Sequence, residues 1–175
     1  MDAYWQSEFR ERMLRFSRER PLGQHLIPVS IKIRTLGGCF CPGCNPHFYR
    51  AMRLEIEKAR REGEEFEVQE HESGPEILVY LAVVGGVLNI SAAMTNLITA
   101  IIKARSEGSN AGDKPFNGVE LIVRGHSKGD DYFEESILRV NSSEDITAKL
   151  VRDALKRRAI VPHPKTPKRS KKKKA

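Results

Sequence analysis

Cysteine is scarce in this 175-residue chain, and its three cysteines, Cys39, Cys41 and Cys44, all lie within six residues. An odd and clustered set cannot form the paired disulfide framework that stabilises small secreted domains. Residues 1–20 also lack the apolar segment of a secretory signal peptide, since they carry five arginines and four acids. We therefore expect a protein of the reducing cytoplasm.

Signatures of hydrolases and of nucleotide-binding enzymes are also missing. The chain contains no G-x-S-x-G, no phosphate loop ending in G-K-[ST], and no G-x-G-x-x-G after a strand pattern. The segment from Arg124 to Asp131 has residue types found in catalytic sites, but its glycines and polar residues predict a hairpin turn. A protein without catalytic activity is therefore favoured.

Basic charge is confined to one end of the chain. The net charge is +7, yet ten Lys or Arg residues and no acid lie from Lys156 onward, so the rest of the chain is mildly acidic. A folded nucleic-acid reader usually carries a basic face on the domain itself, which this pattern does not favour. Residues 161–175 have no apolar content to bury and are predicted to form a disordered basic tail. Weak contacts with nucleic-acid phosphates or anionic lipid are expected only from the bases of this tail, which are Lys165, Lys168, Arg169, Lys171, Lys172, Lys173 and Lys174.

One long apolar run, from Ile77 to Ala104, dominates the sequence, with Lys103 as its only charged residue. A membrane-spanning helix needs about 20 apolar residues, so the run is long enough to span a bilayer. The pair Gly85-Gly86 should break such a helix, because each glycine costs about 1 kcal/mol relative to alanine. We predict two buried helices, from Pro75 to about Val84 and from about Val87 to Arg105. The alternative is a single-span membrane protein anchored by residues 77–104, with its Lys-rich end in the cytoplasm.

Alternation of polar and apolar residues predicts four strands, over residues 29–33, 66–69, 119–123 and 136–140. Helical spacing predicts further helices over residues 2–20 and 47–62, and a last helix capped by Ser142 or Ser143. The expected fold is an α/β two-layer sandwich with a four-stranded sheet. Its element order is strand-helix-strand-helix-helix-strand-strand-helix, preceded by an N-terminal helix.

This order predicts three regions of the chain. Residues 1–24 form an amphipathic helix, residues 25–160 an α/β domain, and residues 161–175 the basic tail. The apolar residues of the first helix recur at spacings of four, four and three, namely Trp5, Phe9, Met13 and Phe16. We expect this helix to dock on the domain, with a partner-binding or interfacial helix as the alternative.

The cysteine-rich segment allows three interpretations. Cys39, Cys41, Cys44 and His47 together make a three-thiolate, one-imidazole set of the kind that binds zinc. Alternatively, Cys41-Pro42-Gly43-Cys44 follows a strand and precedes a helix, whose dipole lowers the pKa of a nearby thiol. In this tetrapeptide the chain resembles the thioredoxin-like oxidoreductases, which implies Cys41 and Cys44 as a redox-active pair. In the third interpretation the cysteines are small apolar residues of a reduced turn, and no cofactor is bound.

The second half of the chain carries a further set of patterns. These are GPEILVYLAVVGG, the helix end IIKARSEG, the strand patterns VELIVRG and SILRV, and the helix SSEDITAKLVRDAL. In them residues 74–160 resemble small bacterial accessory domains of the effector-associated constant-component kind. The resemblance implies a short α/β unit that acts as a non-enzymatic adaptor beside separate effector proteins in bacterial conflict systems. We therefore expect an accessory or protein-interaction module, with a thiol-disulfide oxidoreductase as the alternative.

Overall fold

The computed structural model describes residues 2–19, 26–71, 73–84, 87–126, 132–142 and 144–157. The predicted α/β class is confirmed, but these residues contain six strands where four were predicted. The predicted basic tail lies outside the described residues. In chain order the elements are α1 (Asp2–Glu19), β1 (Leu26–Leu36), α2 (Pro46–Arg61), β2 (Phe66–Gln69), β3 (Glu76–Val84), β4 (Val87–Asn89), α3 (Ala92–Asn110), β5 (Gly118–His126), β6 (Tyr132–Asn141) and α4 (Ala148–Arg157).

The strands form one antiparallel sheet in the order β2-β3-β1-β5-β6, and the short β4 pairs with the end of β3. Because β1 and β2 are both antiparallel to the intervening β3, the unit β1-α2-β2 is a split β-α-β. The unit β3-α3-β5 is split in the same way around β1. This β-α-β-β-α-β succession is the ferredoxin-like arrangement, here extended by the β6 hairpin, α4 and α1. The predicted pairing of the last two strands is confirmed by β5 and β6.

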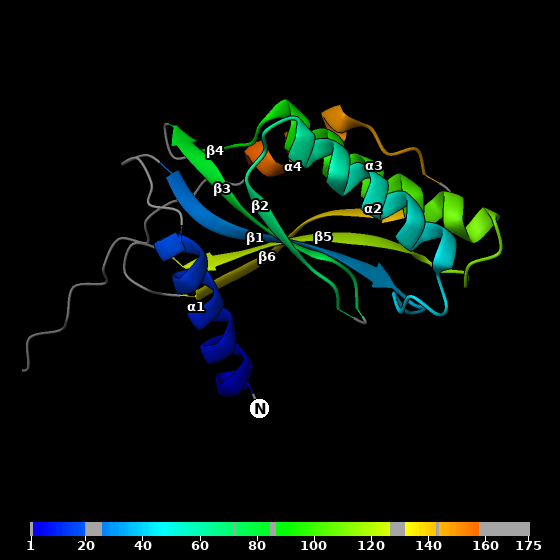
Figure 1. Cartoon of the computed structure of the whole chain (residues 1–175), viewed down its shortest axis with the longest axis horizontal. Coiled ribbons are helices and arrows are strands. Elements are labelled where there is room, and N and C mark those ends of the chain that lie inside the picture. Colours follow the sequence, from blue (N-terminus) through cyan, green and yellow to red (C-terminus); the bar gives the residue numbers. More distant parts are fainter. Residues whose placement is uncertain are drawn as a thin grey trace, which may run out of the picture.

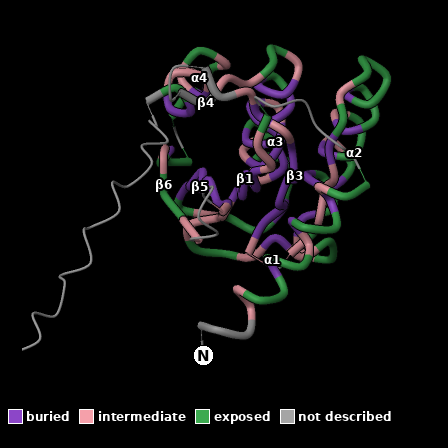
Figure 2. The backbone as a smooth tube through the Cα atoms, turned by 90° about the vertical axis from the view of Figure 1, so that its left-hand side faces the viewer, coloured by how far each residue is buried: buried purple, intermediate pink, exposed green. Residues whose placement is uncertain are grey.

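Helices α2, α3 and α4 lie on one face of the sheet, and α1 lies on the opposite face (Figure 1). Burial is concentrated in the sheet and in the inner sides of α2 and α3 (Figure 2). The predicted two-layer sandwich is therefore corrected to one with a partial third layer. The inner face of the sheet is fully apolar on its three central strands, through Val29, Ile31, Ile33, Ile77, Val79, Leu81, Val119, Leu121 and Val123.

The segment from Glu76 to Val84 is a strand, so the predicted helix from Pro75 to Val84 is wrong. Ile77, Val79 and Leu81 face the main core, while Leu78 packs against α1 on the other face. A strand buried on both faces has a continuous apolar sequence, which periodicity cannot distinguish from a buried helix. The glycine pair predicted to break a helix falls between β3 and β4 and lies outside the described residues.

A spanning helix over residues 77–104 is likewise not formed, because β3 and β4 occupy the first half of that run. None of the helices in the described part of the chain has the length and apolarity needed to cross a bilayer. The second predicted helix does exist, as α3, but it starts at Ala92, five residues later than expected. Ser91 caps it, since its Oγ accepts a hydrogen bond of 3.0 Å from the backbone N–H of Met94.

The last helix, α4, also starts later than predicted. Ser142 or Ser143 was expected to cap it, whereas the helix begins at Ala148. Thr147 provides the capping contact instead, because its Oγ1 accepts a hydrogen bond of 3.2 Å from the backbone N–H of Leu150. Ile146, predicted to lie within the helix, precedes it and is buried in the main core.

Helix α1 packs on the outer face of the sheet, so the predicted docking of this helix on the domain is confirmed. Phe9, Met13 and Phe16 are at most 3% exposed and form one apolar cluster with Leu78. The ring of Phe16 stacks on that of Tyr80 at a centroid distance of 4.5 Å. Aromatic burial of this kind contributes a large share of the energy that holds a short terminal helix in place.

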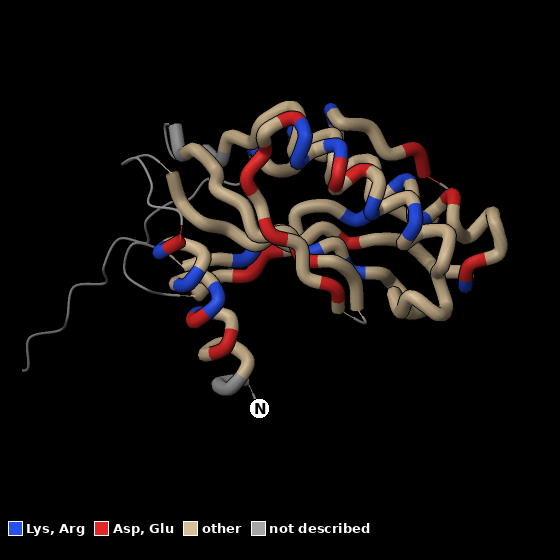
Figure 3. Tube along the Cα trace, viewed as in Figure 1, with Lys and Arg blue, Asp and Glu red and all other residues tan. Residues whose placement is uncertain are grey.

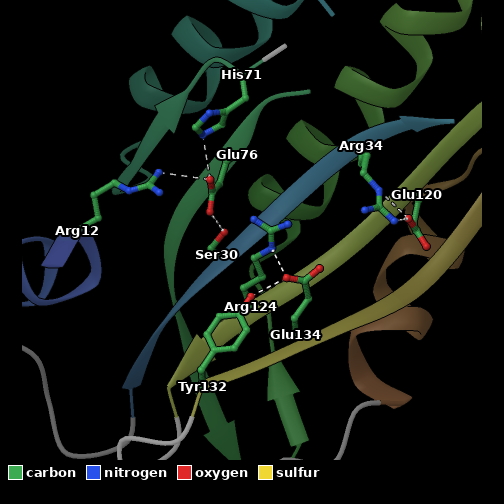
Figure 4. A network of polar contacts seen from close by, with 9 residues as sticks. All are labelled: Arg12, Ser30, Arg34, His71, Glu76, Glu120, Arg124, Tyr132 and Glu134. Carbon is green, nitrogen blue, oxygen red and sulfur yellow. Dashed lines mark hydrogen bonds and ion pairs between the residues drawn. The ribbon is translucent and has the colours of Figure 1, made fainter. Parts of the chain in front are cut away.

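Charged residues lie along α1 and the strands beside it (Figure 3), and several of them form ion pairs (Figure 4). Glu76 is only 1% exposed and is reached by Arg12 of α1 at 3.4 Å, by His71 at 3.0 Å and by the hydroxyl of Ser30. Burial lowers the pKa of His71, although the neighbouring Glu76 opposes this shift. The buried carboxylate of Glu76 on the outer face of β3 is therefore bound by groups from α1, from β1 and from the segment before β3.

Candidate metal centre

The segment linking β1 to α2, residues 37–45, carries all three cysteines and is called the cysteine loop below. It leaves the sheet through Gly37 and Gly38, both with a φ of 73°, a conformation that favours glycine. A Cβ atom on Gly38 would lie 2.7 Å from the carbonyl oxygen of Pro115. The loop is thus pressed against the segment between α3 and β5, residues 111–117.

The turn that presents the cysteines is held by backbone bonds and by one buried amide. The backbone N–H groups of Cys44 and Asn45 both donate to the carbonyl oxygen of Cys41, at 3.1 Å each. Asn45 is fully buried, and its Nδ2 donates to the carbonyl oxygens of Cys39 at 2.7 Å and Cys41 at 3.1 Å. Asn45 therefore fixes the backbone positions of two cysteines and directly follows the third.

Asp113 caps α2 from the neighbouring loop. Its Oδ1 accepts from the backbone N–H of His47 at 3.1 Å, and its Oδ2 accepts from that of Phe48 at 2.8 Å. The next residue, Lys114, donates its backbone N–H to the carbonyl oxygen of Cys44 at 3.1 Å. The loop after α3 consequently holds both the start of α2 and the end of the cysteine loop.

A buried arginine lies behind the cysteine loop. Arg105 of α3 is fully buried, with its guanidinium 4.4 Å from the ring centroid of Phe116 and 5.4 Å from that of Phe40. Its Nη2 donates to the carbonyl oxygen of Lys114 at 2.8 Å. Burial lowers the pKa of Arg105, while the nearby Asp113 and Cys39 raise it. A cation is therefore built into the protein side of the site.

The three thiols converge. The sulfur atoms of Cys39, Cys41 and Cys44 all lie within 4.8 Å of one another, and the sulfurs of Cys39 and Cys41 are 3.5 Å apart. All three are free and partly exposed. These side chains could hold a metal ion through three thiolates.

Hydrogen bonds shift the pKa values of Cys39 and Cys41 in opposite directions. The backbone N–H of Cys41 and the thiols of Cys44 and Cys41 lower the pKa of Cys39 to about 7. Hydrogen bonding to Cys44 and Cys39 raises the pKa of Cys41 to about 11. A hydrogen bond with Cys44 and the nearby thiol groups raise the pKa of Lys114. The helix dipole alone favours cysteines next to α2, whereas these local bonds make Cys39 the more acidic of these two thiols.

The fourth predicted ligand does not join the cluster. The side chain of His47 is exposed and is not among the groups that gather around the three sulfurs. His71, another histidine that could contribute, lies on the outer face of the sheet and pairs with Glu76. The structure thus brings together three of the four predicted ligands.

Sequence reasoning missed three residues that build the site, namely Asn45, Arg105 and Asp113. A weak signal existed for Asn45, because an asparagine followed by proline is typical of a helix start. No local signal marks Asp113, which is 66 residues from His47 in sequence.

Comparison of the chain with protein-family models gave no match. Searches of curated proteins and of solved structures likewise gave no significant match. Function is therefore inferred from the geometry of the cysteine loop and its supports.

Proposed function

We propose that the protein is a non-enzymatic accessory module whose cysteine loop binds zinc through Cys39, Cys41 and Cys44. One observation carries this proposal: the three sulfurs are already close to a metal-binding arrangement. In a tetrahedral site with Zn–S bonds of about 2.3 Å, ligand sulfurs lie about 3.8 Å apart. The sulfurs here lie 3.5 Å apart in one pair and within 4.8 Å in all pairs. Small side-chain rotations are enough to bring the three sulfurs to the spacing of zinc ligands.

Zinc would supply a rigid crosslink and would neutralise part of the charge of three neighbouring thiolates. The loop residues supply the rest of the site. Asn45 holds the backbone of Cys39 and Cys41, and the neighbouring Lys114 holds the carbonyl of Cys44. Supports of this kind orient metal ligands and tune their affinity.

The accessory role combines this site with the resemblance over residues 74–160. Loops on a rigid scaffold are common places for recognition, and the cysteine loop stands on an α/β sandwich with a large apolar core. Zinc held by thiolates suits a reducing compartment, so a cytoplasmic location is part of the proposal. The contacts expected from the basic tail remain a prediction.

Elemental analysis of protein purified without chelator tests the proposal. We expect one zinc per chain, and loss of that metal in the variant Cys39→Ser/Cys44→Ser. The matched control is His47→Ala, which should retain the metal because His47 lies outside the cluster. Substoichiometric metal in the wild-type protein, even after incubation with zinc, would rule out the site.

A thiol-disulfide function is the second candidate, favoured by the contact between the sulfurs of Cys39 and Cys41. Oxidised glutathione would take two electrons and two protons from a pair of thiols, leaving one disulfide and two reduced glutathiones. Mass spectrometry of metal-free protein would show a loss of about 2 Da and identify the linked pair. Retention of three free thiols under mild oxidant excludes this candidate.

A further inference from the structure

We infer that the metal on the cysteine loop keeps its fourth coordination position open and accepts an exogenous thiolate there. The inference rests on the proposed zinc site and deepens it. The thiolate could come from a small free thiol or from a cysteine of another polypeptide, and both offer the same ligand atom.

The first reason is that no fourth protein ligand reaches the cluster within the described part of the chain. Among its Cys, His, Asp and Glu side chains, those of Cys39, Cys41 and Cys44 alone gather as a potential metal-binding group. The nearest acid along the contacting loop, Asp113, has both carboxylate oxygens bound to backbone N–H groups of α2. Asp113 is therefore committed to capping the helix.

The second reason is that the loop is closed on one side and open on the other. Phe40, Asn45 and Arg105 are fully buried and form the protein side of the loop. The tip of the turn is exposed at Pro42 and Gly43, and a Cβ atom on Gly43 would meet nothing within 4 Å. Structural zinc sites are normally closed by four protein ligands, whereas three ligands and an accessible position let water or another ligand bind.

The third reason is charge. Zinc with four thiolates carries two negative charges, and a site of that charge needs nearby cations when it is partly removed from water. Arg105 lies behind the loop and interacts electrostatically with Cys39, and the ammonium of Lys114 lies beside Cys44. With Asp113, which also interacts with Arg105, these groups leave one net positive charge beside the thiolates, and that charge lowers the cost of adding a further thiolate. A soft thiolate also suits a metal that already has sulfur ligands.

Cobalt(II) substitution of the full chain tests the inference. In a buffer with a phosphine reductant and no thiol, three Co–S bonds should give a sulfur-to-cobalt charge-transfer band. Adding 2-mercaptoethanol should raise that band by about one third, since the number of Co–S bonds rises from three to four. The absorbance of the band should reach a plateau as the concentration of 2-mercaptoethanol rises. X-ray absorption of the zinc form should change from three sulfur ligands to four.

Two arms separate the sources of thiolate, and a control variant checks the site. A short peptide with one cysteine is compared with the same peptide carrying serine, and only the first should raise the band. A response to 2-mercaptoethanol but not to the cysteine peptide assigns the position to small thiols. His47→Ala should respond like the wild-type protein.

The two proposals fail in different ways. Absence of any charge-transfer band with cobalt overturns the zinc site itself. A normal band that no thiol changes overturns the open position alone. The same holds if X-ray absorption shows an imidazole ligand from His25 or His163, which lie outside the described residues.

Discussion

Replacing the buried cap of α2 tests the architecture around the cysteine loop. In Asp113→Asn, one of the two acceptor oxygens becomes an NH₂ group that faces a backbone N–H. The backbone N–H of either His47 or Phe48 then loses its acceptor. A buried unsatisfied donor costs about 1–3 kcal/mol. Loss of the negative charge at the helix N-terminus adds about 0.3–1 kcal/mol.

The free energy of unfolding should therefore fall by about 1–4 kcal/mol. For a chain of this size 1 kcal/mol corresponds to about 2–4 °C, so Tm should fall by about 3–16 °C. Urea unfolding and thermal melts followed by circular dichroism measure both quantities on metal-free protein. Glu107→Gln, an exposed acid on α3, is the matched control and should stay within about 0.5 kcal/mol of wild type. A loss below about 0.5 kcal/mol for Asp113→Asn would show that the cap does not act as described.

The same variant should weaken metal binding. Asp113 precedes Lys114, whose backbone N–H holds the carbonyl of Cys44, so a shift of this loop moves a ligand. Changes in groups that support metal ligands reduce affinity by about 10–100-fold. Competition with a chromophoric chelator measures this effect. Unchanged affinity with reduced stability would limit the role of Asp113 to helix capping.

The remaining predictions concern α1, a turn, the thiols and the metal. Phe16→Ala should remove about 3–5 kcal/mol of packing energy and undock α1, and hydrogen exchange in that helix should become faster. Leu14 is exposed, so Leu14→Ala should leave the exchange rates unchanged. Persistent protection of α1 in the first variant would contradict its docking. Gly74→Ala should destabilise the fold by more than about 1 kcal/mol in urea unfolding, because φ is +131° there and a Cβ would collide with a strand carbonyl. A urea unfolding midpoint equal to that of the wild-type protein would refute this reasoning. In metal-free protein, alkylation of Cys39 should be half-maximal near pH 7, because its thiolate forms above a pKa of about 7, while Cys41 should react only at much higher pH. Peptide mapping that finds Cys41 modified first would contradict this order. Removing zinc with a chelator should leave the far-UV circular dichroism spectrum unchanged but lower Tm. At a free zinc concentration of 100 times Kd, bound metal adds about 2.7 kcal/mol to the free energy of unfolding, and chelation removes this contribution. Unfolding on chelation would show that the fold depends on the metal.

The sequence predicted those strands that have one apolar and one polar face. In β1, the alternation of Val29, Ile31 and Ile33 with Ser30 and Lys32 marks the core face correctly. In β3 the same rule failed because α1 covers part of the second face, and Leu78 there is as buried as Ile77. Knowing that α1 packs at this place would have required the tertiary structure, since α1 and β3 are far apart in sequence.

Part of the candidate site could likewise be predicted from the sequence, and part could not. The spacing of the three cysteines within six residues is visible in the sequence, and a local turn is enough to bring them together. Their supports come from elsewhere in the chain, through the side chain of Arg105 and the cap by Asp113. Contacts over such separations depend on how α3 packs beside α2 and leave no periodic signal in the sequence.

The position of these supports indicates what a metal would do here. In a classical zinc finger, the metal provides the folding energy because the apo chain has no core of its own. Here the main core is built mainly from the central strands and the inner sides of α2, α3 and α4, and the cysteine loop adds Phe40 to it but none of its cysteines. Asn45 and Asp113 already hold the loop in place through the protein's own hydrogen bonds. We therefore expect folding not to require the proposed metal, whose binding energy would fix the thiolates and present the proposed open coordination position at the surface of the fold.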